Sequence, residues 1–246
     1  MHDLSAFPPS QMVACGGTLR RLGTGAGSME EAAGRIVGYL YENLGTPAGE
    51  QACALVRFYK THPYGDLDTE LSQFAATVLG ERELLPSTRC LVLLATVGER
   101  PEWHSRHRST GHRAIPLASP QVVASAPMIA QLLEQFGLDV DAVIQPNPSV
   151  LIDAEQRTYN VFYVPEAVGS PYVPAQADFV VPYGIRSVLG FGGVFPTGDL
   201  LTVILFSKIA IPREVANRFK TLALAVKLAT LPFLDDRVFT GRRHGD

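Results

Sequence analysis

Stretches of helical and strand-like periodicity follow one another along the chain after an N-terminal part that shows neither. Residues 1–27 carry clusters of proline and glycine without a sustained period, so we expect an irregular leader. At Ser28 the sequence Ser-Met-Glu-Glu fits a capping box, and the apolar residues that follow it to Leu44 recur at helical spacing. Two apolar runs, Cys53–Tyr59 and Arg89–Val97, predict buried strands.

The second half is predicted to be mostly strand, with one helix before the strands and one after them. The first helix begins at Ser119-Pro120 and reaches Gly137. The last begins at Pro212 and stops at Pro232. The four strand candidates between them are Asn160–Val164, Phe179–Val181, Arg186–Val194 and Leu200–Ser207. This order of elements predicts an α+β fold in which helices flank an antiparallel sheet.

The last predicted helix has two apolar stripes, of which one can cover the sheet. The second stripe consists of Leu224, Leu228 and Leu231. It can contact a second copy of the chain, which would give a homodimer through the terminal helices, or another helix of the same chain. The pattern leaves both arrangements open.

The composition limits the classes of partner. Hydrophobic residues make up 46% of the 246 residues and charged residues 18%, which is typical of a folded globular protein. A net charge of -3 gives no general reason to bind nucleic acid or an anionic membrane. No apolar run approaches the roughly 20 residues of a membrane span, and the N-terminus, with Asp3 and two prolines, does not fit a secretory signal. We therefore expect a cytoplasmic protein with neither a nucleic-acid nor a membrane partner.

The three cysteines do not suggest a disulfide framework or a thiolate zinc site, because Cys15, Cys53 and Cys90 form an odd set without a CxxC pair. Cys53 and Cys90 lie inside apolar runs, where a cysteine is usually a small buried hydrophobe. No Walker A, GxSxG or HExxH motif is present either. We do not expect an enzyme.

Several segments resemble a GAF domain. The stretch 180–207, VVPYGIRSVLGFGGVFPTGDLLTVILFS, is similar to the C-terminal strand pair of that fold. RFYKTHPYGDL, PEWHSRHRSTGHRAIPL and FKTLALAVKLATLPF resemble a GAF-like input region found ahead of bacterial sensor histidine kinases. The resemblance covers one enlarged domain, 28–233, followed by a tail, 234–246. It implies a GAF/PAS-like antiparallel sheet flanked by helices and a role in two-component signal transduction. Whether the chain stands alone or is an excised input module stays open.

The stretch 101–117 is the first candidate site, because it holds three histidines and four arginines. His104, His107 and His112 could ligate a metal, but no fourth ligand lies at conventional spacing. In the resembling family the shared pattern includes Trp103, Arg106, Arg108, His112 and Arg113, and leaves His104 and His107 out. We interpret the stretch as an anion-binding or pocket-organising loop; a solvated loop and one whose arginines pair with Asp153, Glu155, Glu166 or Asp178 are the alternatives.

The long connection 163–183 is the second candidate, since such loops commonly act as lids or binding loops. In GAF-like sensors the ligand pocket lies between the sheet and such loops. The rings expected to line it here are Tyr159, Phe162, Tyr172, Phe179, Tyr183 and Phe191, with Arg186 as a polar contact.

The resemblance implies a regulatory sensor that binds a small ligand and signals through its terminal helices to a histidine kinase or another signalling partner. The identity of any cofactor is left unknown. One alternative is a haem- or metal-based sensor that uses His112 as a ligand. Another is a ligand-free dimerisation module. Free methionine sulfoxide reductases show that a GAF fold can be an enzyme through cysteines in its pocket, but the cysteines of this chain lie in apolar runs or in the leader.

Overall fold

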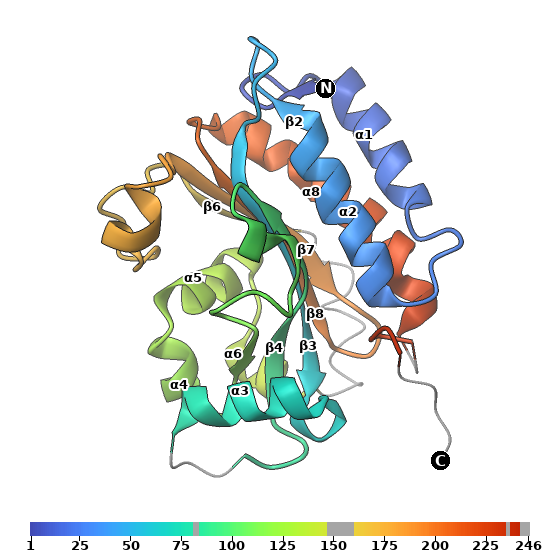
Figure 1. The fold of residues 1–246 in the computed structure, drawn as a ribbon, viewed down its shortest axis with the longest axis vertical. Coiled ribbons are helices and arrows are strands. Elements are labelled where there is room, and N and C mark those ends of the chain that lie inside the picture. The colour runs from blue at the N-terminus through green and yellow to red at the C-terminus, as the bar shows by residue number, and fades with distance from the viewer. Residues whose placement is uncertain (81–83, 147–159, 235–236, 242–246) are drawn as a thin grey trace.

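A single twisted sheet forms the centre of the protein, and helices cover both of its faces (Figure 1). The computed structural model describes residues 1–80, 84–146, 160–234 and 237–241. The sheet has six strands in the order β5-β4-β3-β8-β7-β6, and each neighbouring pair is antiparallel. The strands are β3 (Cys53–Pro63), β4 (Arg89–Gly98), β5 (Ala114–Pro116), β6 (Asn160–Val164), β7 (Ser187–Val194) and β8 (Leu200–Ser207). The predicted α+β class with an antiparallel sheet flanked by helices is confirmed.

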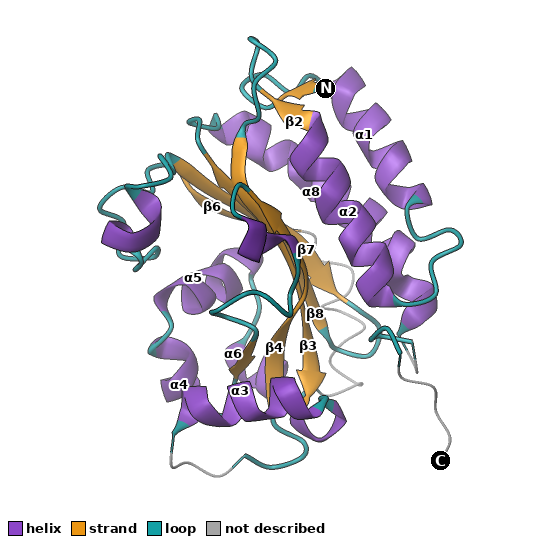
Figure 2. Cartoon of the chain, viewed as in Figure 1, coloured by secondary structure: helices purple, strands orange, loops and turns teal. Residues whose placement is uncertain are grey.

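The helices fall into two groups on the two faces of the sheet (Figures 1 and 2). One face carries α1 (Pro9–Arg21), α2 (Met29–Asn43) and α8 (Arg213–Thr230), in which α8 packs on β6 and β7 and α2 packs on β3 and β4. The opposite side carries α4 (Pro120–Ala124), α5 (Pro127–Phe136) and α6 (Val140–Ile144), while α3 (Thr69–Leu79) packs on β5. The short elements are β1 (His2–Asp3), β2 (Leu44–Gly45), η1 (Tyr64–Asp66), η2 (Pro101–His104), η3 (Gln176–Val180) and η4 (Leu231–Phe233).

Each face of the sheet has its own hydrophobic core, because side chains alternate along a strand. On β8, Leu201, Val203 and Leu205 belong to the core shared with α2 and α8. Leu200 and Ile204 belong to the second core, which α5 and the long loops cover. We call these the helix face and the loop face. Within the described residues no helix is long and apolar enough to cross a bilayer.

The N-terminal segment differs from the irregular leader expected for residues 1–27, because it contains α1. Cys15 and Leu19, one helical turn apart, are both fully buried where α1 packs on α8. This contact also buries α8 on two sides within one chain. The sequence pattern did not predict α1 for two reasons. Its apolar residues are few, and they are interrupted by Gly16 and Gly17, which are poor helix formers.

The predicted N-terminal cap of α2 by Ser28 is confirmed. The Ser28 hydroxyl accepts a hydrogen bond from the amide of Glu31 at 3.1 Å. The Glu31 carboxylate does not complete the expected box at Ser28, but accepts a hydrogen bond from the amide of Gly27 at 2.8 Å.

Two other expectations are corrected by the local backbone. The predicted strand Phe179–Val181 is not a strand, because residues 176–180 form the π-helical turn η3. The helix predicted from Ser119 to Gly137 is broken into α4 and α5, because Pro127 has no amide to continue the helical hydrogen bonds.

Candidate functional site

The loop that connects β4 to β5 crosses the edge of the sheet and is fixed at both ends by glutamates from helices. The Arg106 guanidinium donates from Nε and from one terminal nitrogen to the Glu30 carboxylate, at 2.6 and 3.2 Å. Arg113 lies 2.7 Å from Glu70, whose other oxygen lies 3.1 Å from Nδ1 of His107. These arginines therefore neutralise carboxylates in the first turns of α2 and α3.

The internal partners of the loop differ from those expected. The sequence offered Asp153, Glu155, Glu166 and Asp178 as candidates, all in the second half. Asp153 and Glu155 lie outside the described residues, and Glu166 and Asp178 are exposed. The partners come instead from the first half, because the fold places the starts of α2 and α3 beside the loop. Arg106 and Arg113 thus form ion pairs within the protein, with Glu30 and Glu70, and are not free anion-binding groups.

A buried arginine lies beneath this loop, in the middle of β3. Arg57 is 9% exposed and points to the loop face, where it lies between Thr96 of β4 and Ile204 of β8 in the strand register. Its terminal nitrogens donate to the Tyr59 hydroxyl at 3.1 Å and to the Ser109 hydroxyl at 3.2 Å. Both acceptors are neutral, and among the described residues no carboxylate forms an ion pair with Arg57. Among the described residues, the Arg57 guanidinium is therefore hydrogen-bonded to hydroxyl groups alone.

Several polar atoms around Arg57 lack hydrogen-bond partners within the part of the chain that is described. They are Nε of Arg57 and the hydroxyl oxygens of Thr96 and Thr202. Thr96 lies opposite Arg57 in the register, and Thr202 lies opposite Tyr59, so all four side chains share the loop face. Buried polar groups are usually satisfied, and an unsatisfied cluster calls for a physical explanation.

His112, in the same loop, lies close enough to Arg57 for the guanidinium charge to affect its ring. The residue has φ of 59°, a left-handed conformation that histidine adopts more often than most residues, and it is exposed as a whole. Desolvation of the ring by the surrounding protein lowers the pKa of the imidazole below its usual value, and the positive charge of Arg57 lowers it further. A neutral imidazole beside a guanidinium can donate or accept a hydrogen bond without adding charge.

The three histidines of the loop have different neighbours. His104 Nε2 forms a hydrogen bond with the Gly98 carbonyl at 2.8 Å, His107 Nδ1 lies 3.1 Å from Glu70, and the pKa of His112 is affected by the charge of Arg57. Within the described ranges no three side chains of His, Cys, Asp or Glu gather in a way that suits a metal ion.

Aromatic rings join the two candidate loops. Trp103 lies 4.7 Å from Tyr183 and 5.6 Å from Phe179, measured between ring centroids, and Phe179 packs at 5.0 Å on Phe206 of β8. The Tyr183 hydroxyl also accepts a hydrogen bond from Arg100 at 2.9 Å. The structure thus brings together Trp103 and Tyr183, two of the candidate site residues, at one end of the loop face.

Other predicted site residues lie elsewhere. Phe191 is fully buried on the helix face, where it packs on Phe219 of α8, because side-chain alternation turns its neighbours Gly190 and Gly192 toward the loop face. Arg108 and Arg186 are exposed, and Tyr172 is 38% exposed. Tyr159 lies outside the described residues.

The glycines of β7 make room for the protein itself. A Cβ on Gly192 would lie 2.0 Å from the Leu201 carbonyl oxygen, and one on Gly190 would lie 3.2 Å from the Phe162 ring. Neither glycine therefore opens space for a ligand.

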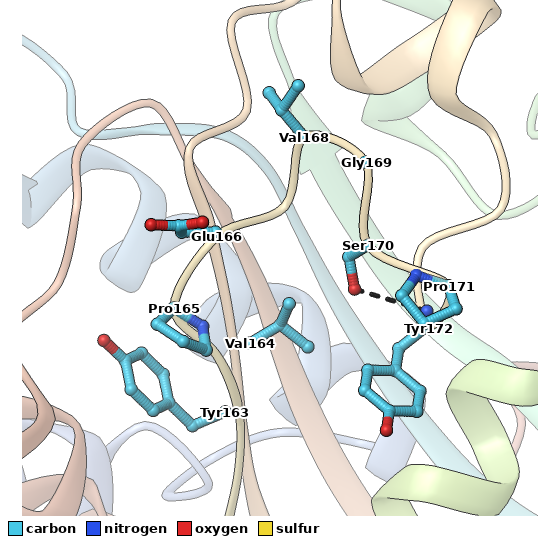
Figure 3. A pocket seen from close by; sticks show the side chains of 9 residues that line it. All are labelled: Tyr163, Val164, Pro165, Glu166, Val168, Gly169, Ser170, Pro171 and Tyr172. Carbon is cyan, nitrogen blue, oxygen red and sulfur yellow. Dashed lines mark hydrogen bonds between the residues drawn. The ribbon is translucent and has the colours of Figure 1, made fainter.

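A surface hollow of about 340 Å³ lies beside the end of β6, between Tyr163 and Tyr172 (Figure 3). Its rim carries Glu166 and Val168, which are both exposed. The hydroxyl of Tyr163 is already used, since it donates to the Ile211 carbonyl. The hollow thus offers no buried polar group that is free to recognise a ligand.

The loop that forms this hollow is held by one side chain. The side-chain oxygen of Gln176 accepts a hydrogen bond from the backbone N–H of Gly169 at 2.9 Å. Its side-chain nitrogen donates to the backbone carbonyls of Ala167 and Val173 at 2.9 and 2.6 Å. The segment is therefore an internally bonded cover and not an open lid.

Arg57 is a candidate that the sequence pattern could have indicated. It is the single charged residue in CALVRFY, an otherwise apolar or aromatic run. A charge in the middle of a buried strand is uncommon unless it has a partner or a function.

No family model matches the chain, and no curated protein does. Among solved structures, the free methionine-R-sulfoxide reductase from Neisseria meningitidis, in complex with its substrate, is 13% identical; the match covers 91% of this chain and 89% of that one, with a TM-score of 0.46. The phycoerythrobilin-bound GAF domain from a cyanobacterial phytochrome is 10% identical over 91% of this chain and 96% of that one, with a TM-score of 0.38.

Proposed function

We propose that the protein is a GAF-like regulatory module that binds a small molecule on the loop face of its sheet. The observation that carries this proposal is the cluster of Arg57, Tyr59, Thr96 and Ser109, which is buried in an otherwise apolar layer and incompletely hydrogen-bonded. Such a cluster is costly for stability alone, and sites with convergent polar groups in apolar surroundings are where small ligands bind.

The same loop offers a route from this site to the helices. Ser109 contacts Arg57, and three residues earlier Arg106 binds Glu30 at the start of α2. Glu30 also accepts a hydrogen bond from the amide of Thr240, in the segment that follows α8. A ligand that displaces Ser109 would move Arg106, and the packing of α2 and the C-terminal segment would respond.

The proposed module binds without doing chemistry. Burial raises the pKa of the Cys15, Cys53 and Cys90 thiols to about 12, so each stays protonated and unreactive near neutral pH. We propose a cytoplasmic histidine kinase or another signalling protein as the partner. We also keep the homodimer as a proposal, with the exposed Leu224 and half-buried Leu228 of α8 as the contact.

Native mass spectrometry of the full chain purified from the cells that produce it tests this function. A retained small molecule, seen as a mass above that of the denatured chain, is the expected result. An unliganded protein whose melting temperature no compound in a metabolite library raises would contradict it. An absorbance spectrum of the same sample decides the alternative of a haem sensor that uses His112.

A further inference from the structure

We infer that the ligand of the loop face carries an oxyanion, a carboxylate or a phosphate group, and that this group binds the guanidinium of Arg57. This inference rests on the proposed function and specifies the chemical class of its ligand. It starts from Arg57, because that side chain is nine-tenths buried and its Nε has no hydrogen-bond partner among the described residues.

Charge is the first argument. Removing a guanidinium from water is costly unless a carboxylate or phosphate offsets its charge. The buried arginines of the neighbouring loop follow this rule, since Arg106 pairs with Glu30 and Arg113 with Glu70. Arg57 departs from it among the described residues, where its hydrogen-bond acceptors are the hydroxyls of Tyr59 and Ser109.

Geometry is the second argument. The guanidinium presents donors in a planar fork that matches two oxygens of one anion. In the part of the chain that the structure describes, Nε has no partner and the terminal nitrogen beside it donates only to Ser109. The Ser109 hydroxyl in turn donates to the Gly111 carbonyl at 3.1 Å. An oxyanion that takes the place of the Ser109 hydroxyl would therefore receive two parallel hydrogen bonds from Arg57.

The surroundings suit an anion as well. Thr96 lies beside Arg57 in the register, and its buried hydroxyl has no partner within the described ranges, so it can donate to a second oxygen. The neutral ring of His112 can also donate. Glu30 and Glu70, the carboxylates that hold this loop, have their charges offset by Arg106 and Arg113.

The experiment measures the melting temperature of the full chain against inorganic phosphate and, separately, succinate, with chloride holding the ionic strength constant. We expect one of the two series to raise the melting temperature of the wild type in a saturable way. Arg57→Gln should weaken the apparent affinity by at least about tenfold. Arg108→Gln is the control, because it removes an exposed charge from the β4–β5 loop; this variant should respond like the wild type.

A second measurement covers the case in which Arg57→Gln does not fold. The side-chain Nε–H resonance of Arg57 in the wild type should shift on titration with the effective anion. A wild type that responds to neither anion, or an Arg57→Gln protein that responds as the wild type does, would overturn the inference. If native mass spectrometry then shows a retained neutral molecule, the proposed function stands and only the ligand class is wrong. If nothing is retained, both fail.

Discussion

Arg106 and Glu30 form a two-point ion pair that ties the β4–β5 loop to the first turn of α2. The two hydrogen bonds measure 2.6 and 3.2 Å, and the Arg106 side chain is only 4% exposed. Arg106 also lies over the ring of Phe239, with 5.4 Å between its guanidinium carbon and the ring centroid. The pair thus joins three segments that are far apart in sequence.

Replacement of Glu30 by glutamine should destabilise the fold strongly. The variant leaves the buried Arg106 charge without its main partner, which typically costs about 3 kcal/mol or more in the free energy of unfolding. Urea denaturation of the variant and the wild type measures this loss in the free energy of unfolding. Glu102→Gln is the matched control, because Glu102 pairs with Arg100 in the same loop but at an exposed position, where little change is expected. Equal losses in the two variants would show that the Arg106 pair is not a structural anchor.

The protonation of His112 should depend on Arg57. In the folded chain, desolvation and then the Arg57 charge lower the pKa of His112 below the unperturbed 6.5. Protonation therefore favours the unfolded state: the stability linked to His112 is full above pH 6.5 and is lost as the pH falls toward the lowered value. NMR titration of the ring protons should show the pKa moving toward 6.5 in Arg57→Gln. An unchanged pKa, or the same shift in Arg108→Gln, would mean that the two side chains are not coupled.

The thiols should resist alkylation in the folded protein. Burial raises the pKa of Cys15, Cys53 and Cys90 to about 12, whereas the unperturbed value is 9.0. The folded state keeps these protons, so their contribution to stability is complete below about pH 9 and is lost as the pH rises toward 12. Iodoacetamide at about pH 8 should modify none of the three at a measurable rate before unfolding, and all three in urea. Rapid modification of one thiol under native conditions would identify a reactive cysteine and reopen the enzyme alternative.

Helix α1 should contribute to stability although it lies in the segment expected to be irregular. Leu19 is fully buried against the remaining helices, and Leu19→Ala should cost about 2–4 kcal/mol through lost burial and the cavity that remains. Val13→Ala on the same helix is the control, because Val13 is 67% exposed. Thermal or urea unfolding of both variants checks this. If Leu19→Ala and the wild type unfold alike, α1 does not dock as described.

The sequence by itself determined the elements whose cause is local. The proline before α8, the Ser28 cap of α2 and the unbroken apolar runs of β4 and β8 act within a few residues, so the α+β class and the positions of these four elements followed from the pattern. Trp103 and Tyr183 were each named as candidate site residues from the sequence, but the contact between them was not predicted.

Tertiary structure alone decided which polar groups are paired and which face a strand residue takes. Arg106 and Arg113 are neutralised by Glu30 and Glu70, residues distant in sequence that only the fold brings close. Phe191 lies in the core and not in the site, because its position in the register turns it toward α8. Arg57 stands out only when its neighbours are known: a buried charge is defined by what surrounds it, and those neighbours come from β4, β8 and the loop.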